Sequence, residues 1–261
     1  LTMELAFDSS RDFAEYKKEV YDKLYELLGM GEFAKVEPNI EIEFEKDFDT
    51  FREIRFTFDT ERYCRAMCHL WIPKLGKDKY GVVICMQGHA SGMHISMGRP
   101  IYPDDDKTIN SGDRDFAVQI IKEGYAALII EQRAFGERKS PHLDHENNKY
   151  TTCLHASMIA SMLGRTLLGE RVWDVSRAID ALSAFPQIDT ERVACMGNSG
   201  GGTATFYSAC MHERIKIAMP SCSVCTYRDS IVAMRHCTCN YIPKVAKYFD
   251  MGDLSCLIAP R

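Results

Sequence analysis

Residues 192–210 read RVACMGNSGGGTATFYSAC. The first five form a short apolar run typical of a strand, and residues 202–210 are typical of a helix. Glycines beside the serine lack the side chains that would collide in a sharp turn between the two. The motif Gly197-Asn198-Ser199-Gly200-Gly201 in this context therefore predicts a nucleophile elbow, a turn that presents the Ser199 hydroxyl at the edge of a sheet.

A serine held in this way can attack an ester carbonyl. The amide of Gly200, at the start of the predicted helix, would then donate to the oxyanion that forms. The hydroxyl also needs a base, and elbows of this kind are followed along the chain by an acid and then a histidine. Neither histidine after Ser199 fits. His212 would lie too far along the same helix, and His236 lies in a cysteine-rich segment whose following acids, Asp250 and Asp253, come in the wrong order.

Composition excludes several kinds of partner. The 261 residues carry 32 Lys and Arg against 37 Asp and Glu, a formal net charge of −5 without a basic run, so no nucleic-acid partner is predicted. The sequence has no apolar segment long enough to predict a membrane span, and its first residues do not resemble a signal peptide. The 11 cysteines are scattered and odd in number. This fits a reducing compartment, so we predict a cytoplasmic protein. The sequence leaves the oligomeric state open.

Helix and strand patterns alternate along the chain. Apolar residues at helical spacing predict a helix over 10–28 that ends at Gly29, another over 115–123, and a long helical stretch over 155–185 that is interrupted near Gly164 and Gly169.

Predicted strands complete the pattern. Alternation over 40–72 predicts antiparallel strands, and the apolar runs 81–86 and 125–130 predict strands buried on both faces. Residues 192–196 and 215–219 predict two more. The order predicts an α/β fold with a mostly parallel central sheet and helices on both faces. We expect a single domain over 1–261, with residues 1–35 as a helical extension.

Several stretches resemble the acetylxylan esterase and cephalosporin-C deacetylase group of α/β-hydrolases, which is related to dienelactone hydrolases. The resemblance covers about residues 70–261 and is carried by residues 173–180 through the turn at Ser199, and by 220–225, 236–243 and 248–254. Upstream, Gln87-Gly88-His89 resembles the oxyanion loop of the group, with Gln in place of His. Residues 131–136 resemble its Gln-Arg-Gly-x-Gly turn, with Ala134 in place of Gly.

The resemblance implies the α/β-hydrolase fold, with Ser199 as nucleophile and the backbone amides of His89 and Gly200 as the oxyanion hole. In the group, a segment like residues 257–261 leads into the strand that carries the acid, and the histidine follows later. We therefore expect acid and base beyond Arg261, and a fold that is incomplete at its C-terminal end. The 261 residues alone are then expected not to hydrolyse esters at an enzymatic rate.

Other candidates compete with structural interpretations. Cys222, Cys225, Cys237 and Cys239 have the outline of a four-thiolate zinc site. The second pair is spaced more tightly than usual, so packed thiols near the pocket are favoured over zinc or a disulfide. No metal and no cofactor is predicted.

Charged and histidine side chains are mostly interpreted as structural. The side chain of His89 is expected to line the pocket and His94 to have no role. Arg133 and Asp174 are expected to fasten loops and helices by ion pairs. A solvated loop is predicted for 104–106, and a loop bordering the cleft, rather than a metal site, for the residues His142, Asp144, His145 and Glu146.

These residues together predict a serine carboxylesterase that removes small acyl groups from a sugar or similar alcohol through an acyl-enzyme. Acetyl is the favoured acyl group. Two alternatives stay open. One is a non-catalytic, degenerate α/β-hydrolase retained as a binding or scaffold protein, and the other is a peptidase of the same fold. The predicted partner is a small-molecule ester substrate, and the sequence does not fix its acyl or alcohol group.

Overall fold

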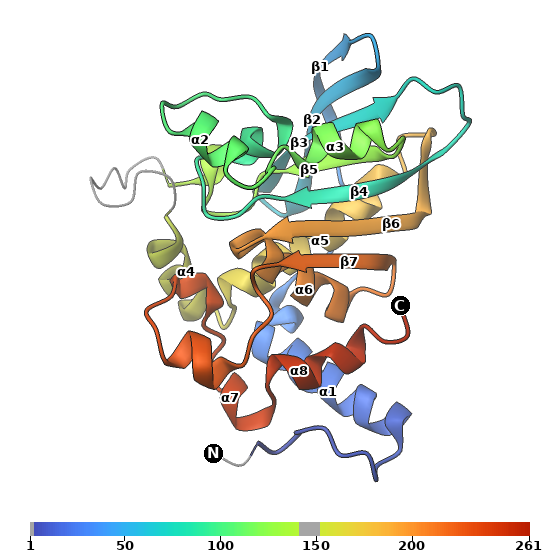
Figure 1. The fold of residues 1–261 in the computed structure, drawn as a ribbon. Helices are drawn as coiled ribbons and strands as arrows, with labels where there is room; N and C mark the ends of the chain where they lie inside the picture. Colours follow the sequence, from blue (N-terminus) through green and yellow to red (C-terminus); the bar gives the residue numbers. More distant parts are fainter. Residues whose placement is uncertain (1–2, 141–151) are drawn as a thin grey trace.

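A mixed sheet forms the centre of the protein in the computed structural model, which describes residues 3–140 and 152–261 (Figure 1). Seven strands of the described residues are ordered β1-β2-β3-β5-β4-β6-β7. Antiparallel pairing joins β1, β2, β3 and β5, whereas β5, β4, β6 and β7 are parallel to one another. The strands are β1 (Glu41–Asp47), β2 (Phe51–Glu61), β3 (Cys64–Pro73), β4 (Tyr80–Met86), β5 (Ala126–Ile130), β6 (Ile188–Asn198) and β7 (Ile215–Ser221).

Helices cover both faces of this sheet, as predicted. The α-helices are α1 (Phe13–Leu28), α2 (Asp105–Asn110), α3 (Phe116–Lys122), α4 (Cys153–Met162), α5 (Leu167–Leu182), α6 (Gly200–Met211), α7 (Val245–Tyr248) and α8 (Met251–Leu254). Short 3₁₀ segments include η2 (Met93–Met97) and η5 (Thr238–Asn240). In the part of the chain that the structure describes, none of the helices has both the length and the apolar character needed to cross a membrane.

Strand β4 illustrates how the two faces are filled. Its alternate residues Ile84 and Met86 pack in the core shared with α5 and α6, whereas Val83 and Cys85 pack with α3. Successive side chains of a strand point to opposite faces, so a strand between two helical layers must be apolar throughout. The uninterrupted apolar run of the sequence is therefore explained by burial on both sides.

Helix α1 ends where the sequence predicted and begins slightly later. The Asp12 side chain caps its first turn by accepting from the Glu15 amide, and Gly29 ends it in the left-handed region. The helix packs on α6 and on the C-terminal helical segment around α8 (Figure 1). Phe13, the first residue of the helix, is 47% exposed, and the buried face starts at Tyr16.

The long helical stretch is divided once. Gly164 adopts φ +72 between α4 and α5, as expected of an interruption. The prediction of a second interruption near Gly169 was wrong, because Gly169 lies inside α5. A Cβ on Gly169 would sit 2.2 Å from the carbonyl oxygen of Leu28 at the end of α1. This glycine therefore permits close packing of two segments rather than a break.

Candidate functional site

Ser199 lies at a sharp junction between strand and helix. Strand β6 ends with Gly197 and Asn198, and α6 begins at Gly200. Ser199 itself has φ +52 and ψ −119, in a region that residues with a side chain seldom occupy. Such a conformation costs about 1–3 kcal/mol and persists only where the surrounding structure imposes it. The side chain is exposed, so this strained turn presents a hydroxyl to solvent.

The turn is pressed against the end of β4. A Cβ on Gly201 would lie 1.9 Å from the carbonyl oxygen of Met86 and 2.5 Å from that of Gln87. Real Cβ atoms do not approach backbone oxygens so closely, so only glycine fits at this position. The close approach explains why the motif needs a glycine two residues after Ser199.

Ser199 opens into a cavity of about 450 Å³. Its walls come from the loop after β4, the start of α6, the segment after β7 and the segment around η5. The lining residues are His89, Ser199, Gly200, Thr203, Pro220, Cys222, Ser223, Val224, Cys225, Ser230, Ile231, Arg235, His236, Cys237 and Asn240. This cavity therefore combines the exposed hydroxyl with polar groups from several distant segments.

The loop after β4 brings His89 to the same turn. A Cβ on Gly200 would be 2.5 Å from Cε1 of the His89 ring, so the ring lies directly over the start of α6. The backbone amides of His89 and Gly200 donate no hydrogen bond to any residue within the described ranges. Among the described residues, neither amide therefore has an acceptor, and the loop of His89 reaches Ser199, because a Cβ on Gly88 would lie 3.3 Å from Ser199 Cβ.

The histidines after Ser199 do not reach it. His212 is half-buried directly after α6, where Nε2 lies 3.2 Å from the carbonyl oxygen of Val172, and removal of its ring from solvent lowers its pKa to about 4. His236 lines the cavity, but its Nε2 pairs with Ser230 Oγ at 3.2 Å. Among residues 3–140 and 152–261, no histidine forms a hydrogen bond with Ser199. The sequence had excluded His212 as its base and had not favoured His236.

A buried carboxyl group anchors the loop that carries His89. Glu131, just after β5, accepts from Gln87 Nε2 at 2.9 Å and from the Met93 amide at 3.1 Å. Gln132 Nε2 donates to the Gln87 carbonyl oxygen at 2.6 Å. Burial raises the pKa of Glu131 to about 7, although the Met93 amide acts in the opposite direction. The loop after β4 is therefore anchored by the buried carboxyl group of Glu131, whose pKa lies near neutrality.

This shift predicts a dependence of stability on pH. A carboxyl group whose pKa is raised by folding binds its proton more tightly in the native state, so the stability it contributes is lost as pH rises toward about 7. Relative to Glu131→Gln, the free energy of unfolding of the wild type should fall between about pH 4.5 and pH 7, by at most about 1.4 kcal/mol per pH unit. Urea unfolding at several pH values measures the difference. A constant difference across that range would contradict the prediction.

Arg133 and Asp174 have the structural roles that the sequence predicted. Asp174 pairs with Arg133 at 2.8 Å and with Arg138 at 2.6 Å. Although burial acts to raise the pKa of Asp174, the two guanidinium groups lower it to about 2. Ala134, the residue after Arg133, has φ +70, which lies in the left-handed region that favours glycine. That conformation explains why a glycine was expected at this position.

The prediction of a solvated loop at residues 104–106 was wrong for Asp105. Its carboxylate is buried and lies 2.9 Å from His94 Nε2, and it accepts from the Tyr102 amide at 2.8 Å. Ser91 Oγ also donates to it. These contacts fold the segment around η2 onto the start of α2. His94, for which the sequence predicted no role, is a buried partner in this structural cluster.

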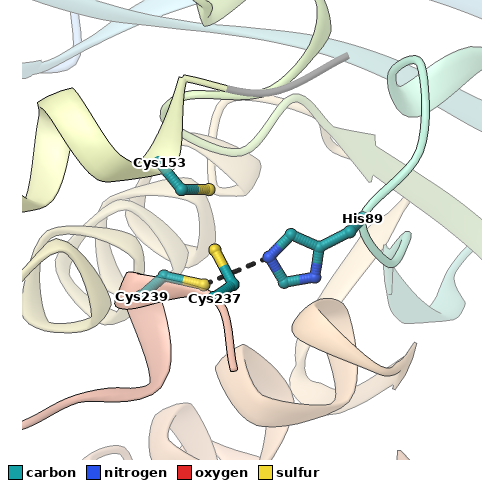
Figure 2. Close-up of side chains that lie close together, drawn as sticks. All are labelled: His89, Cys153, Cys237 and Cys239. Atoms are coloured by element: carbon teal, nitrogen blue, oxygen red, sulfur yellow. Dashed lines mark hydrogen bonds between the residues drawn. The ribbon is translucent and has the colours of Figure 1, made fainter. Parts of the chain in front are cut away.

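The cysteines group differently from the sequence pattern. All 11 are free. Cys237 and Cys239 meet Cys153 and His89, and the ligand atoms of these four residues all lie within 4.8 Å of one another (Figure 2). Cys222 and Cys225 line the Ser199 cavity and are outside this group. Cys153 was missed because it is far from the other three in sequence and has no motif around it.

His89 is strongly influenced by these thiols. Burial acts to lower its pKa, but hydrogen bonding to Cys153 and Cys237 outweighs burial and raises the pKa to about 9. Its Nε2 lies 3.2 Å from Cys239 Sγ. The ring therefore faces the thiols rather than serving as a base for Ser199. His142, Asp144, His145 and Glu146, expected in a loop beside the cleft, lie outside the described residues.

Comparison of the sequence with known proteins finds one matching family and one similar protein. The family described as “Glucuronyl esterase, fungi” matches residues 115–228. A Bacillus subtilis (strain 168) protein named “Putative hydrolase YtaP” is 26% identical over 149 residues, 56% of this chain. The match spans 46% of that relative, less than half of its length.

Solved structures agree over nearly the whole chain. A “putative acetyl xylan esterase” from Bacteroides fragilis NCTC 9343 superposes with a TM-score of 0.80 at 17% identity, covering 99% of this chain and 70% of that one. A glucuronoyl esterase from Solibacter usitatus gives 0.68 at 17% identity, covering 100% and 77%. The protein therefore has the α/β-hydrolase fold, and the resemblance to acetylxylan esterases found in the sequence is confirmed.

Proposed function

We propose that this protein is a serine carboxylesterase that hydrolyses small acyl esters of a sugar or similar alcohol, with acetyl as the favoured acyl group. The observation that carries the proposal is the conformation of Ser199. A non-glycine residue with φ +52 stands exposed between a buried strand and a helix, at the edge of a cavity of about 450 Å³. Strain of this kind is typical of functional sites, and a nucleophile elbow is the arrangement it matches.

In the proposed reaction, Ser199 Oγ attacks the ester carbonyl carbon and loses its proton to a base. The carbonyl oxygen becomes an oxyanion, which accepts hydrogen bonds from the amides of His89 and Gly200. Collapse breaks the bond to the alcohol oxygen, and the alcohol leaves with a proton from the protonated base. Water then attacks the acyl-Ser199 ester and releases the acid. Both amides lack another acceptor among the described residues, which supports this assignment.

The base and the acid are proposed to lie outside these 261 residues. No histidine of the described ranges is hydrogen bonded to Ser199. Ile217 and Met219 on the edge strand β7 are 60% and 42% exposed, an apolar surface that further elements of the fold would cover. Both observations support a site that is completed by additional residues.

A sugar ester is the proposed substrate class for two reasons. The relatives reported above are named as acetyl xylan and glucuronoyl esterases. The cavity is lined by hydroxyl, amide and guanidinium groups, including those of Ser230, Asn240 and Arg235, which suit a hydroxylated alcohol better than a long acyl chain. The free thiols support cytoplasm as the proposed compartment.

One rival function has an observation in its favour. The absence of a hydrogen-bonded histidine at Ser199, within the residues described, is what a non-catalytic scaffold would also present. The two proposals differ in turnover. A scaffold has no base at all, whereas the esterase has one that lies elsewhere.

The test compares two polypeptides, residues 1–261 and a form that also contains any residues encoded after Arg261. Both are assayed with 4-nitrophenyl acetate and with acetylated xylose. We expect turnover in the longer form, and a rate lower by about 10³-fold or more in the shorter one, because it lacks the base. Full turnover by residues 1–261 would contradict the proposed location of the base. Absence of turnover in both forms would contradict the esterase.

A further inference from the structure

Three distant segments bring soft ligands together beside the Ser199 cavity. His89 comes from the loop after β4, Cys153 from the start of α4, and Cys237 and Cys239 from the segment at η5 (Figure 2). Their side chains point toward one another, with all ligand atoms within 4.8 Å and His89 Nε2 at 3.2 Å from Cys239 Sγ. Four such atoms converging on one point is more than packing of small apolar side chains requires.

The set and its spacing fit one kind of ion. Three thiolates and one imidazole are a known ligand set of structural Zn²⁺, with Zn–S of about 2.3 Å and Zn–N of about 2.0 Å. Tetrahedral geometry with these bonds separates the ligand atoms by about 3.5–3.8 Å, so only small side-chain rotations are needed. Four protein ligands leave no open position, which makes the site structural rather than catalytic.

A buried positive charge beside the cluster gives independent support. Arg171 is 1% exposed, and Nη2 donates to Cys153 Sγ at 3.3 Å and to the Arg133 carbonyl oxygen at 2.8 Å. In the described part of the chain, no carboxylate pairs with this guanidinium. A buried charge without a counter-charge is costly. A zinc ion with three thiolates and an imidazole has a net charge of −1, which would neutralise it.

The surroundings also suit a metal. Ala134, Phe135 and Leu167 form a small apolar cluster with Cys153 and Cys239. The ring of His89 packs edge-on against the ring of Phe135, with 5.0 Å between the ring centroids. An apolar shell of this kind limits access of water to bound metal and strengthens the ligation.

We propose that His89, Cys153, Cys237 and Cys239 bind one Zn²⁺ ion, which ties the loop after β4 to α4 and to the segment at η5. The thiols, and the His89 ring where it carries a second proton, release their protons to solvent as the metal binds, because the ligands are thiolates and a neutral imidazole. The ion fixes the backbone at His89 and the wall of the cavity formed by Cys237. This site replaces both the prediction of no metal and the four-cysteine pattern, because Cys222 and Cys225 are not part of it.

Metal content tests the proposal without reference to esterase activity. Protein purified under reducing conditions without chelator is dialysed and analysed by inductively coupled plasma mass spectrometry. We expect one zinc per chain. Cys153→Ser and Cys239→Ser should each weaken zinc binding by more than about 100-fold, since loss of a ligand exceeds the effect of losing a neighbouring hydrogen bond. The matched control is the double variant Cys222→Ser, Cys225→Ser, which should retain the metal.

Because substitution of a buried cysteine can prevent folding, the wild type is also tested directly. Chelation with 1,10-phenanthroline should lower Tm, and Zn²⁺ alone should restore it. Replacement by Co²⁺ should produce the near-ultraviolet charge-transfer absorption of thiolate ligands. Wild-type protein with reduced thiols that contains no zinc and takes up none would overturn the proposal. So would loss of the metal from the Cys222, Cys225 variant, or a disulfide between two of the three proposed thiolates.

Discussion

Replacing Ser199 with alanine is expected to lower kcat/KM for ester hydrolysis by about 10⁴-fold or more. The variant loses the oxygen that forms the acyl-enzyme, while the amides of His89 and Gly200 and the cavity remain. The residual rate should therefore be that of an oxyanion hole acting on water. The measurement is hydrolysis of 4-nitrophenyl acetate by the polypeptide that contains any residues encoded after Arg261.

Ser183→Ala is the matched control. Ser183 follows α5, is exposed, and its hydroxyl donates only to the carbonyl oxygen of Asp180. The same chemical change there should leave kcat/KM unaltered. Hydrolysis retained by Ser199→Ala at the rate of this control would rule out Ser199 as the nucleophile.

Replacing Gly201 with alanine is expected to destabilise the fold by about 3 kcal/mol or more. The new methyl group, at the start of α6, would stand 1.9 Å from the carbonyl oxygen of Met86, the last residue of β4, and 2.5 Å from that of Gln87. The Met86 carbonyl cannot move away without disturbing the pairing of β4 with β6, in which Met86 lies opposite Gly197. Urea unfolding followed by circular dichroism measures the change.

Gly252→Ala is the control for this substitution. Gly252 lies in α8, and a Cβ there would meet nothing within 4 Å. Alanine is the better helix former, so this variant should be unchanged or more stable by up to about 1 kcal/mol. Equal stability of the two variants would show that the turn at Ser199 is not held by the contact with β4.

Local patterns in the sequence predicted the elements of the fold well. The turn at Ser199 is predictable because its strand, glycines and helix are contiguous, and β4 because burial on both faces requires an unbroken apolar run. Gly169 was misinterpreted for the opposite reason. Its small size serves a contact with Leu28, a residue far away in sequence that no local pattern reveals.

The same limit applies to the site. Asp105 was assigned to a solvated loop because three adjacent acids are usually exposed, and only its tertiary contacts with His94 and two backbone amides make it buried. The spacing of cysteines suggested a group of four along the chain. The fold instead brings Cys153 and His89 to the second pair. Pairing between segments that are distant in sequence depends on topology, which spacing does not encode.

Covalent labelling determines whether Ser199 Oγ is the nucleophile. The polypeptide with any residues encoded after Arg261 is treated with a fluorophosphonate and digested with trypsin, and the peptide 193–214 is fragmented to separate Ser199 from the buried Ser208. We predict one adduct, on Ser199, that is absent from Ser199→Ala. An unmodified Ser199, with the adduct elsewhere or nowhere, would show that Ser199 is not the nucleophile.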